Sequence, residues 1–335
     1  MTSKGSILAA QRERRSEWVM QRKAIDPDFA PAVPPSVRAN QDAERSCLPV
    51  TVAERTSCAD QALIFLHLPK CGGTTLNRII EWEYPPMRIF SIDPSFFRWS
   101  HRRLSRWPSE RLAKMRVFKG HMPFGLHERL PQPATYITFL REPVERVISE
   151  YYFALHYRLH PQHQRMQTLS LEDYALKTPH HNLQTKLLAG RGNHPDFLAG
   201  DCDETTVALA KHNLARHFSF AGLTERFDEG LAVLKLMFGW NIAQYASFNV
   251  TRVRPKKDTV SAAVQAAIAE RNRYDVALYE HVASLYQEML ARDGDRVRSE
   301  LDAIRSAKSL GAVESAYYLT ASALRKAISR IHSAI

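Results

Sequence analysis

The sequence predicts an α/β domain built around a mostly parallel central sheet, and three observations support this. Short apolar runs typical of buried strands alternate along the chain with longer stretches of helical periodicity. A strand, a glycine-containing turn and a helix follow one another at 62–82. The 335 residues, 44% hydrophobic and 24% charged, are enough for one large core of ordinary globular composition.

Local patterns give the order of the elements. The first strand is expected at 62–67, an apolar run that ends in a turn containing proline and glycines. Ser109 can cap one helix, Pro143 suits the first turn of another, and the longest helix is expected to stop near Gly294. The other expected strands are 116–119, 135–140 and 218–223, and the expected helices are 74–82, 109–115, 143–157, 227–238 and 261–292.

We divide the chain into three parts. Residues 1–60 carry many charges and several prolines, which indicates an irregular, partly helical N-terminal extension. The principal domain is expected at 61–294, and 295–335 as a helical C-terminal extension.

The composition limits the kinds of binding partner and the cellular compartment that we expect. A formal charge of +11 favours an anionic partner, with nucleotide, nucleic acid, acidic polysaccharide and membrane surface all open. The four cysteines are scattered without zinc-type spacing, which suits a reducing compartment. The first 23 residues lack the apolar core of a signal peptide, so we expect a cytoplasmic protein. Contact with a membrane surface has no specific support in the sequence.

The turn after the first strand has the features of a phosphate-binding loop. Its glycines allow backbone N–H groups to approach an anion, the following helix adds its positive end, and a lysine and two threonines add a cation and hydroxyls. The lysine precedes the glycines, unlike the Walker A order, so a magnesium-dependent NTPase is disfavoured. The alternative is an ordinary strand-to-helix turn. The candidate ligand-binding residues are Lys70, Cys71, Gly72, Gly73, Thr74 and Thr75.

Cys71 could also be a nucleophile, because a cysteine before a helix can have a lowered pKa. A tyrosine-phosphatase loop needs five residues between its cysteine and arginine, and here six separate Cys71 from Arg78. We therefore expect Cys71 to contribute its backbone N–H.

A second motif lies at 139–152. Arg141 stands at the end of a strand and Ser149 about two helical turns later, so both could bind one phosphate, Arg141 through its guanidinium fork. The alternative is that Arg141 pairs with Glu142 or Glu145, and that Ser149 is a small residue on a packed face.

Together the two motifs resemble the PAPS-dependent sulfotransferases (PAPS, 3'-phosphoadenosine-5'-phosphosulfate), specifically the group that contains heparan sulfate 2-O-sulfotransferase and its bacterial relatives. The resemblance covers about 61–292, with further similar segments at 119–125, 182–190, 221–227 and 249–256. It implies a P-loop-like three-layer fold, with the sheet flanked by helices, and an O-sulfotransferase that needs no metal. PAPS would be the co-substrate, adenosine 3',5'-bisphosphate the product, and a glycan or glycoconjugate hydroxyl, including an anionic glycan, the acceptor.

The resemblance also assigns residues. The loop at 69–76 would hold the 5'-phosphosulfate, and Arg141 and Ser149 the 3'-phosphate. His121 matches the family's catalytic histidine, and an imidazole suits a general base for the acceptor hydroxyl. Lys70 would stabilise the leaving phosphate. A second histidine of the 2-O-sulfotransferase is Lys119 here, which leaves a two-histidine mechanism open to question. The alternative for His121 is a locally bonded, packed histidine.

Two basic regions allow several interpretations. Arg254 and Lys256 are expected to contact the nucleotide, since the family uses a loop there, although solvated charge is the default. The stretch 98–116 combines basic residues with two tryptophans and suits an acidic ligand or a solvated helix face equally.

Two other functions stay open at this stage. One is a nucleotide-binding module of the same fold that transfers nothing. The other is a basic nucleic-acid-binding protein, although no motif points to a specific nucleic acid. The spacing of His156, His160 and His163 could suggest a metal, but Pro161 interrupts any helix there, so we expect a loop face.

Overall fold

The computed structural model describes residues 61–92, 103–160, 162–178, 180–190, 200–242 and 257–307, together with 320–321, 324–325 and 327–329. The expected N-terminal extension lies outside the described residues, and so do Arg254 and Lys256.

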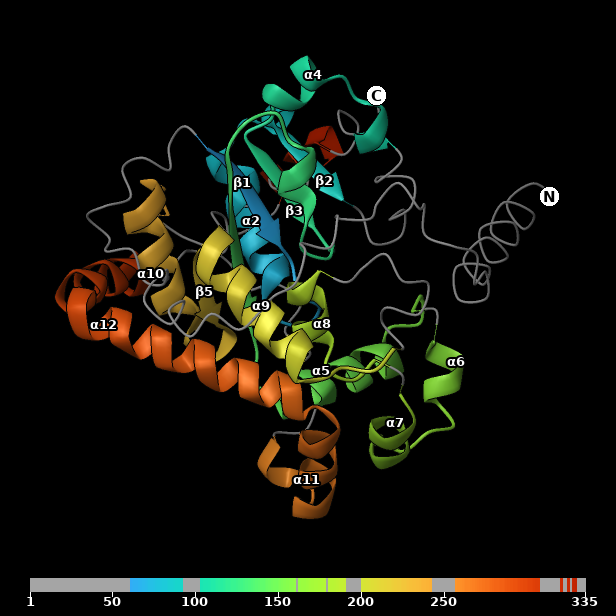
Figure 1. Ribbon diagram of the computed structural model, residues 1–335. Coiled ribbons are helices and arrows are strands. Elements are labelled where there is room, and N and C mark those ends of the chain that lie inside the picture. The colour runs from blue at the N-terminus through green and yellow to red at the C-terminus, as the bar shows by residue number, and fades with distance from the viewer. Residues whose placement is uncertain are drawn as a thin grey trace.

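Five parallel strands form the central sheet in the order β2-β3-β1-β4-β5 (Figure 1). Helices pack around this sheet, which confirms the predicted α/β class. The strands predicted near 62, 116, 135 and 218 are present, and β2 was not predicted. Their bounds are β1 Ala62–Leu66, β2 Ile89–Ile92, β3 Val117–Gly120, β4 Ala134–Leu140 and β5 Phe218–Leu223.

The strand order sets where a ligand can bind. β1 is central and lies between β3 and β4, and the chain leaves β1 toward β2 but leaves β4 toward β5. In parallel α/β sheets, ligands bind at the carboxyl edge where neighbouring connections diverge in this way. The loops that follow β1 and β4 are therefore the expected place for a site, and these two loops carry the phosphate loop and Arg141.

The helices predicted near 74, 109, 143 and 227 are present, whereas the helices at Leu171–Lys177 and Glu204–His217 were not predicted. The predicted helix at 227–238 is confirmed at both ends. The larger helices are α2 Gly73–Glu83, α5 Pro143–His156, α9 Glu204–His217, α10 Phe227–Phe238, α11 Ala262–Arg271 and α12 Arg273–Ala307. The shorter ones are α4 Ser109–Ala113, α6 His163–Met166, α7 Leu171–Lys177 and α8 Leu183–Ala189, with 3-10 turns at Pro86–Arg88, Leu126–Arg129, Thr224–Arg226 and Lys257–Thr259.

The long helical region predicted over 261–292 is present, but its predicted end near Gly294 is wrong. The region is divided at Asn272, whose side chain donates to Ile268 O and accepts from Asn182 N. Beyond this point α12 continues through Gly294 to Ala307. A glycine costs a helix interior only about 1 kcal/mol relative to alanine, and the turns beyond it bury Val297 and Leu301.

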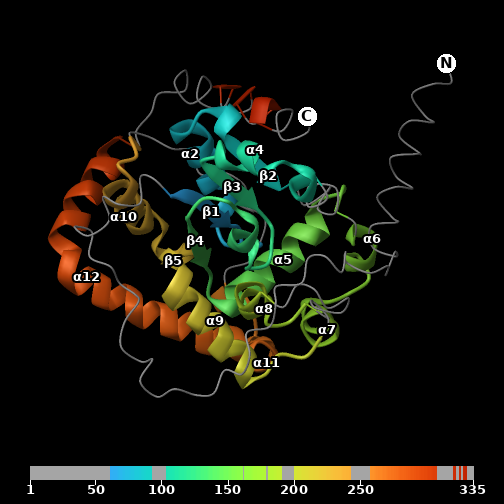
Figure 2. The same ribbon diagram turned by 45° about the horizontal axis from the view of Figure 1, so that its top comes forward.

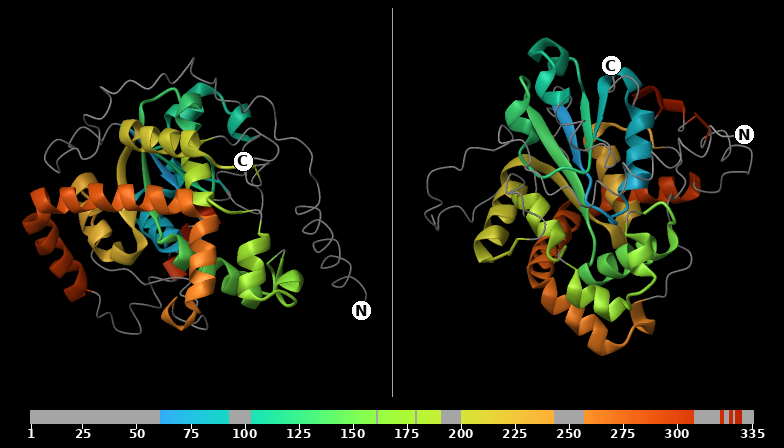
Figure 3. Two further views of the ribbon diagram at one scale, coloured as in Figure 1. Left: turned by 60° about the horizontal axis from the view of Figure 1, so that its bottom comes forward. Right: turned by 90° about the vertical axis from the view of Figure 1, so that its right-hand side faces the viewer.

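Two apolar clusters hold the domain together. The larger one covers the sheet, whose β1 is buried at every residue, and extends under α12, which packs on α9, α10 and β5 (Figure 2). The smaller one joins α5, α6, α7 and α11, and these helices gather at one side of the molecule (Figure 3). The smaller cluster fixes α5, which begins directly after the Arg141 loop.

Among the described helices, none is long and apolar enough to cross a membrane.

Candidate active site

The loop between β1 and α2 adopts a conformation that favours glycine. Lys70 and Gly72 have left-handed backbones, with φ of 68° and 73°. A lysine in this region carries strain of about 1–3 kcal/mol, and such residues cluster at functional sites. A Cβ on Gly73 would lie 2.0 Å from Cδ2 of His67, so the loop needs a glycine at the first residue of α2.

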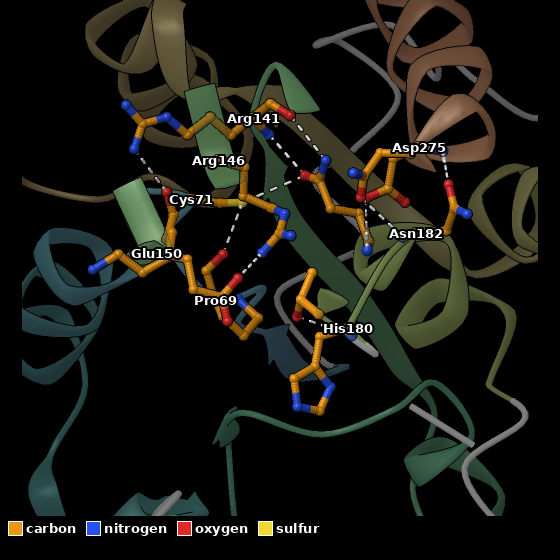
Figure 4. A network of polar contacts seen from close by, with 12 residues as sticks. Pro69, Cys71, Arg141, Arg146, Glu150, His180, Asn182 and Asp275 are labelled. Atoms are coloured by element: carbon orange, nitrogen blue, oxygen red, sulfur yellow. Dashed lines mark hydrogen bonds and ion pairs between the residues drawn. The ribbon is translucent and has the colours of Figure 1, made fainter. Parts of the chain in front are cut away.

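Contacts with the end of β4 and with α8 hold this loop in place (Figure 4). Arg141 donates from Nη1 to the carbonyl of Lys70 at 3.1 Å. Gln184 accepts from the backbone N–H of Arg141 and donates to its carbonyl, both at 2.9 Å. The same Gln184 Oε1 lies 3.4 Å from the Sγ of Cys71. The phosphate loop and the Arg141 loop therefore form one connected unit.

Lys70 is a partly buried cation at this edge. Its Nζ lies 3.6 Å from the centroid of the Phe153 ring on α5, a cation–π contact. Burial lowers the pKa of Lys70 to about 8, against the smaller opposing effect of Glu150. At neutral pH the ammonium is still mostly protonated, as a role at a leaving phosphate requires.

Cys71 is 1% exposed, and burial raises the pKa of its thiol to about 12. The thiolate is therefore disfavoured, which weighs against a nucleophile. Its backbone N–H donates weakly to Leu68 O at 3.4 Å. Thr74 is half-buried and Thr75 buried at the start of α2. Ligand binding by Cys71, Gly72, Gly73, Thr74 and Thr75 stays a prediction.

Arg141 and Ser149 lie at the end of β4 and on α5. Arg141 Nη2 is 3.0 Å from Glu145 Oε2, the ion pair named above as the alternative to phosphate binding. Ser149 is 4% exposed. Binding of the 3'-phosphate by these two residues stays a prediction, and it requires Arg141 to share or exchange its carboxylate partner.

A second arginine of α5 lies deeper. Arg146 is 1% exposed and pairs with Glu150 at 2.5 Å. Burial opposes its charge, but Glu150 and Asp275 raise the pKa of Arg146 above its ordinary value. Burial likewise works to raise the pKa of Glu150, yet Arg146 brings it below its ordinary value. Both groups therefore stay ionised, and the pair as a whole carries no net charge.

His121 lies at the same edge, one residue past β3. Leu66 of β1 and Gly120 of β3 are register partners, so the residues that follow them lie side by side. The rings of His67 and His121 stack with centroids 4.1 Å apart. Nδ1 of His121 is 2.7 Å from the carbonyl of His67. A carbonyl only accepts, so Nδ1 carries the proton and Nε2 the lone pair that a base needs.

Lys119 lies two residues earlier, within β3. Its Nζ pairs with Glu81 at 2.8 Å, and both side chains are nearly inaccessible to solvent. It also donates to Oδ1 of Asn77 at 3.2 Å. A second imidazole does stand next to His121, but it comes from His67 on the neighbouring strand.

His67, Asn77 and Glu81 are the site residues that sequence reasoning missed. The signal for His67 was available, because one predicted strand ends at His67 and another is followed by Gly120 and His121. Its use required the knowledge that β1 and β3 are neighbours and end in register.

Of the three histidines His156, His160 and His163, the last two form hydrogen bonds with nearby backbone groups. His163 donates from Nδ1 to Ala154 O, and His160 Nδ1 accepts from Gln162 N. Within the described ranges, no three His, Cys, Asp or Glu side chains gather as metal ligands do.

Comparison with known proteins identifies the family. The family model for galactose-3-O-sulfotransferase matches residues 92–315, about two thirds of the chain. The chain belongs to the galactose-3-O-sulfotransferase family. The matched range includes His121, Arg141 and Ser149, and the phosphate loop precedes it.

Curated members of this family are similar over part of their length. Galactose-3-O-sulfotransferase 3 of Mus musculus is 27% identical over 256 residues, which are 70% of this chain and 58% of that protein. The Homo sapiens protein of the same name is 27% identical over 192 residues, 53% of this chain and 44% of its own. The chain thus spans about half the length of these relatives. The predicted sulfotransferase resemblance is confirmed at family level, while the placement in the 2-O-sulfotransferase group stays a prediction.

Proposed function

We propose that this protein transfers a sulfuryl group from PAPS to a hydroxyl of a glycan or glycoconjugate. The observation that carries the proposal is the pairing of two groups at one sheet edge. His121 is held with its Nε2 as the acceptor, and the β1–α2 loop offers a helix N-terminus and the Lys70 ammonium. Family membership supports the reaction type and the glycan acceptor. The family name makes the 3-hydroxyl of galactose the first position to test.

In the proposed reaction, the acceptor oxygen attacks the sulfur of PAPS in line with the bond to the nucleotide phosphate. The new S–O bond forms as the S–O bond to the phosphate breaks, and adenosine 3',5'-bisphosphate leaves. His121 Nε2 takes the proton of the hydroxyl, and Lys70 stabilises the charge that develops on the phosphate. Arg141, Ser149, Arg254 and Lys256 are proposed to bind the nucleotide.

Two measurements test this proposal. Adenosine 3',5'-bisphosphate should raise the melting temperature, since a ligand at 100 times its Kd stabilises by about 2.7 kcal/mol. Radiolabelled PAPS with a panel of galactose-terminated and other oligosaccharides should give a sulfated product.

His121→Ala should lower kcat by about 10²–10⁴-fold, the usual contribution of a general base, and Lys70→Ala by about 10²–10³-fold. Both should melt as the wild type does. His212→Ala and Lys177→Ala remove the same residue types from exposed positions and should change nothing. No thermal shift at millimolar nucleotide would sink the proposal, whereas a shift without product across the panel would favour a non-catalytic nucleotide-binding module.

A further inference from the structure

A chain of polar side chains leads from a buried carboxylate to His121. Glu81 accepts from Nζ of Lys119 at 2.8 Å, and the same ammonium donates to Oδ1 of Asn77 at 3.2 Å. Nδ2 of Asn77 lies 3.2 Å from Nδ1 of His67. The ring of His67 stacks on that of His121. Neither Glu81 nor Lys119 lies at the rim, because their side chains are 1% and 6% exposed.

The donor and acceptor groups of these side chains fix the direction of each hydrogen bond between them. An ammonium only donates hydrogen bonds, so the carbonyl end of the Asn77 amide must face Lys119. Its NH₂ end then faces His67 and donates to Nδ1. Neutral His67 therefore carries its proton on Nε2. A proton on Nδ1 would set two N–H groups against each other, so the contact disfavours the imidazolium.

The position of His67 is equally constrained. The residue is 8% exposed, and its Cδ2–Nε2 edge lies where a Cβ on Gly73 would be, 2.0–2.1 Å away. Phe65 stacks at 5.4 Å between centroids. His121 covers the ring as well, and the His67 carbonyl receives the Nδ1–H of His121. The ring of His67 is thus a fixed support for His121.

The charge of this support affects the proposed base. A cationic His67 at 4.1 Å would oppose proton uptake by His121, because like charges repel at this distance. Among the described contacts, Lys119 on β3 and Glu81 on α2 are joined to the pair through Asn77, and Arg78 contacts the other Glu81 oxygen at 3.3 Å.

We propose that Glu81, Lys119, Asn77 and His67 form a positioning relay for His121. The relay holds His67 as a neutral, Nε2-protonated imidazole, and so keeps His121 oriented and able to accept a proton. His67 is a positioning residue and not the base. The inference rests on the proposed function only for the role of His121.

The first test measures the wild-type protein. ¹⁵N-histidine NMR of the full chain should show His67 as the Nε2–H tautomer, still neutral at about pH 6, below the ordinary imidazole pKa of about 6.5. His121 should appear as the Nδ1–H tautomer. Spectra of His67→Gln and His121→Gln assign the two signals. A protonated or Nδ1–H His67 at that pH overturns the relay.

The second test reverses the direction of the hydrogen bond between residue 77 and His67. Asn77→Asp keeps the shape and the contact with Lys119, but a carboxylate has no N–H to donate, so Nδ1 of His67 must carry a proton, in the Nδ1–H tautomer or in the imidazolium. We expect kcat to fall about 10–100-fold, the scale of a misplaced catalytic group, with little change in the KM for PAPS. Gln164→Glu adds the same charge at an exposed position of α6 and should keep wild-type kcat.

The outcomes separate the two proposals. His67 protonated on Nδ1, as either tautomer or imidazolium, together with wild-type kcat in Asn77→Asp overturns the relay and leaves sulfuryl transfer intact. Absence of transfer in the wild type contradicts the proposed function, while the NMR result still decides whether His67 is held neutral. If Asn77→Asp does not fold, the wild-type spectra alone decide the relay.

Discussion

Lys70 combines an unusual backbone conformation with a partly buried ammonium. Its backbone is left-handed, which a residue with a Cβ rarely adopts, and its ammonium lies over the Phe153 ring. Burial favours the neutral amine, so the pKa of Lys70 falls to about 8. An anionic donor beside the ammonium would favour the charged form again. The charge of Lys70 should therefore depend on whether the donor is bound.

This dependence predicts that kcat/KM and kcat lose activity at two different alkaline pH values. In the proposed reaction Lys70 acts as the cation, so activity should be present below its pKa and be lost as pH rises through it. The profile of kcat/KM reports the free enzyme and should fall above about pH 8. The profile of kcat reports the enzyme with its donor bound and should fall only at a higher pH.

Lys70→Arg is the matched variant for this prediction. An arginine stays charged throughout this pH range, so the limb in kcat/KM should disappear even where overall activity is lower. A limb near pH 8 that survives in Lys70→Arg would assign it to another group.

At the scale of the element, α2 is held at both ends by other parts of the chain. Its N-terminus meets the phosphate loop, and its C-terminus is capped by Arg325 from the far end of the sequence. This guanidinium donates to the carbonyls of Glu81, Trp82 and Tyr84 at 2.6, 3.1 and 3.0 Å. Helices leave their last carbonyls without intrahelical partners, and a cation there is favourable. The helix that carries Asn77 and Glu81 is thus anchored by the C-terminal segment.

Arg325→Ala should accordingly lower the stability of the fold by about 1–2 kcal/mol, the range for a cation at a partly buried helix C-terminus. Urea unfolding followed by circular dichroism measures this. Arg305→Ala, on an exposed face of α12, is the control and should have little effect. An unchanged midpoint in Arg325→Ala would show that water replaces the cap at no cost.

At the scale of the whole molecule, periodicity was enough to predict the sheet class but not every strand. The runs that became β1, β4 and β5 are long or rich in β-branched and aromatic residues. β2 has four residues, as β3 has, but it directly follows a 3-10 turn that begins at Pro86, and its three apolar residues read as part of that irregular segment. Gly294 was interpreted as a helix end because sequence cannot show that α12 packs beyond it.

In the candidate site too, some residues could be predicted from the sequence and their contacts could not. Lys70, His121 and Arg141 each follow a strand, and parallel strands bring such residues to one edge. Lys119 was interpreted as a departure from a two-histidine site, because it stands where the resembled family has a second histidine. Its partners Glu81 and Asn77 lie 38 and 42 residues away, so no local pattern links them. Strand register decides which residues meet, and a single sequence does not contain it.

The packing of α12 predicts how the chain responds to truncation. Val297, Leu301 and Ile304 are 2%, 7% and 1% exposed in the main core, beyond the boundary expected at 294. Burying such side chains contributes about 1.5–3 kcal/mol each, and a domain is stable by only about 5–15 kcal/mol in total.

A chain that ends at residue 294 should therefore not fold stably. A chain that ends at Ala307 keeps these side chains but loses the Arg325 cap and the hydrogen bonds of buried Ser329 with β2, so its urea midpoint should lie at or below that of Arg325→Ala. Circular dichroism and the thermal shift with adenosine 3',5'-bisphosphate compare the three proteins. Equal midpoints for the chains that end at 294 and 307 would contradict the prediction and would instead support 294 as the end of the folded domain.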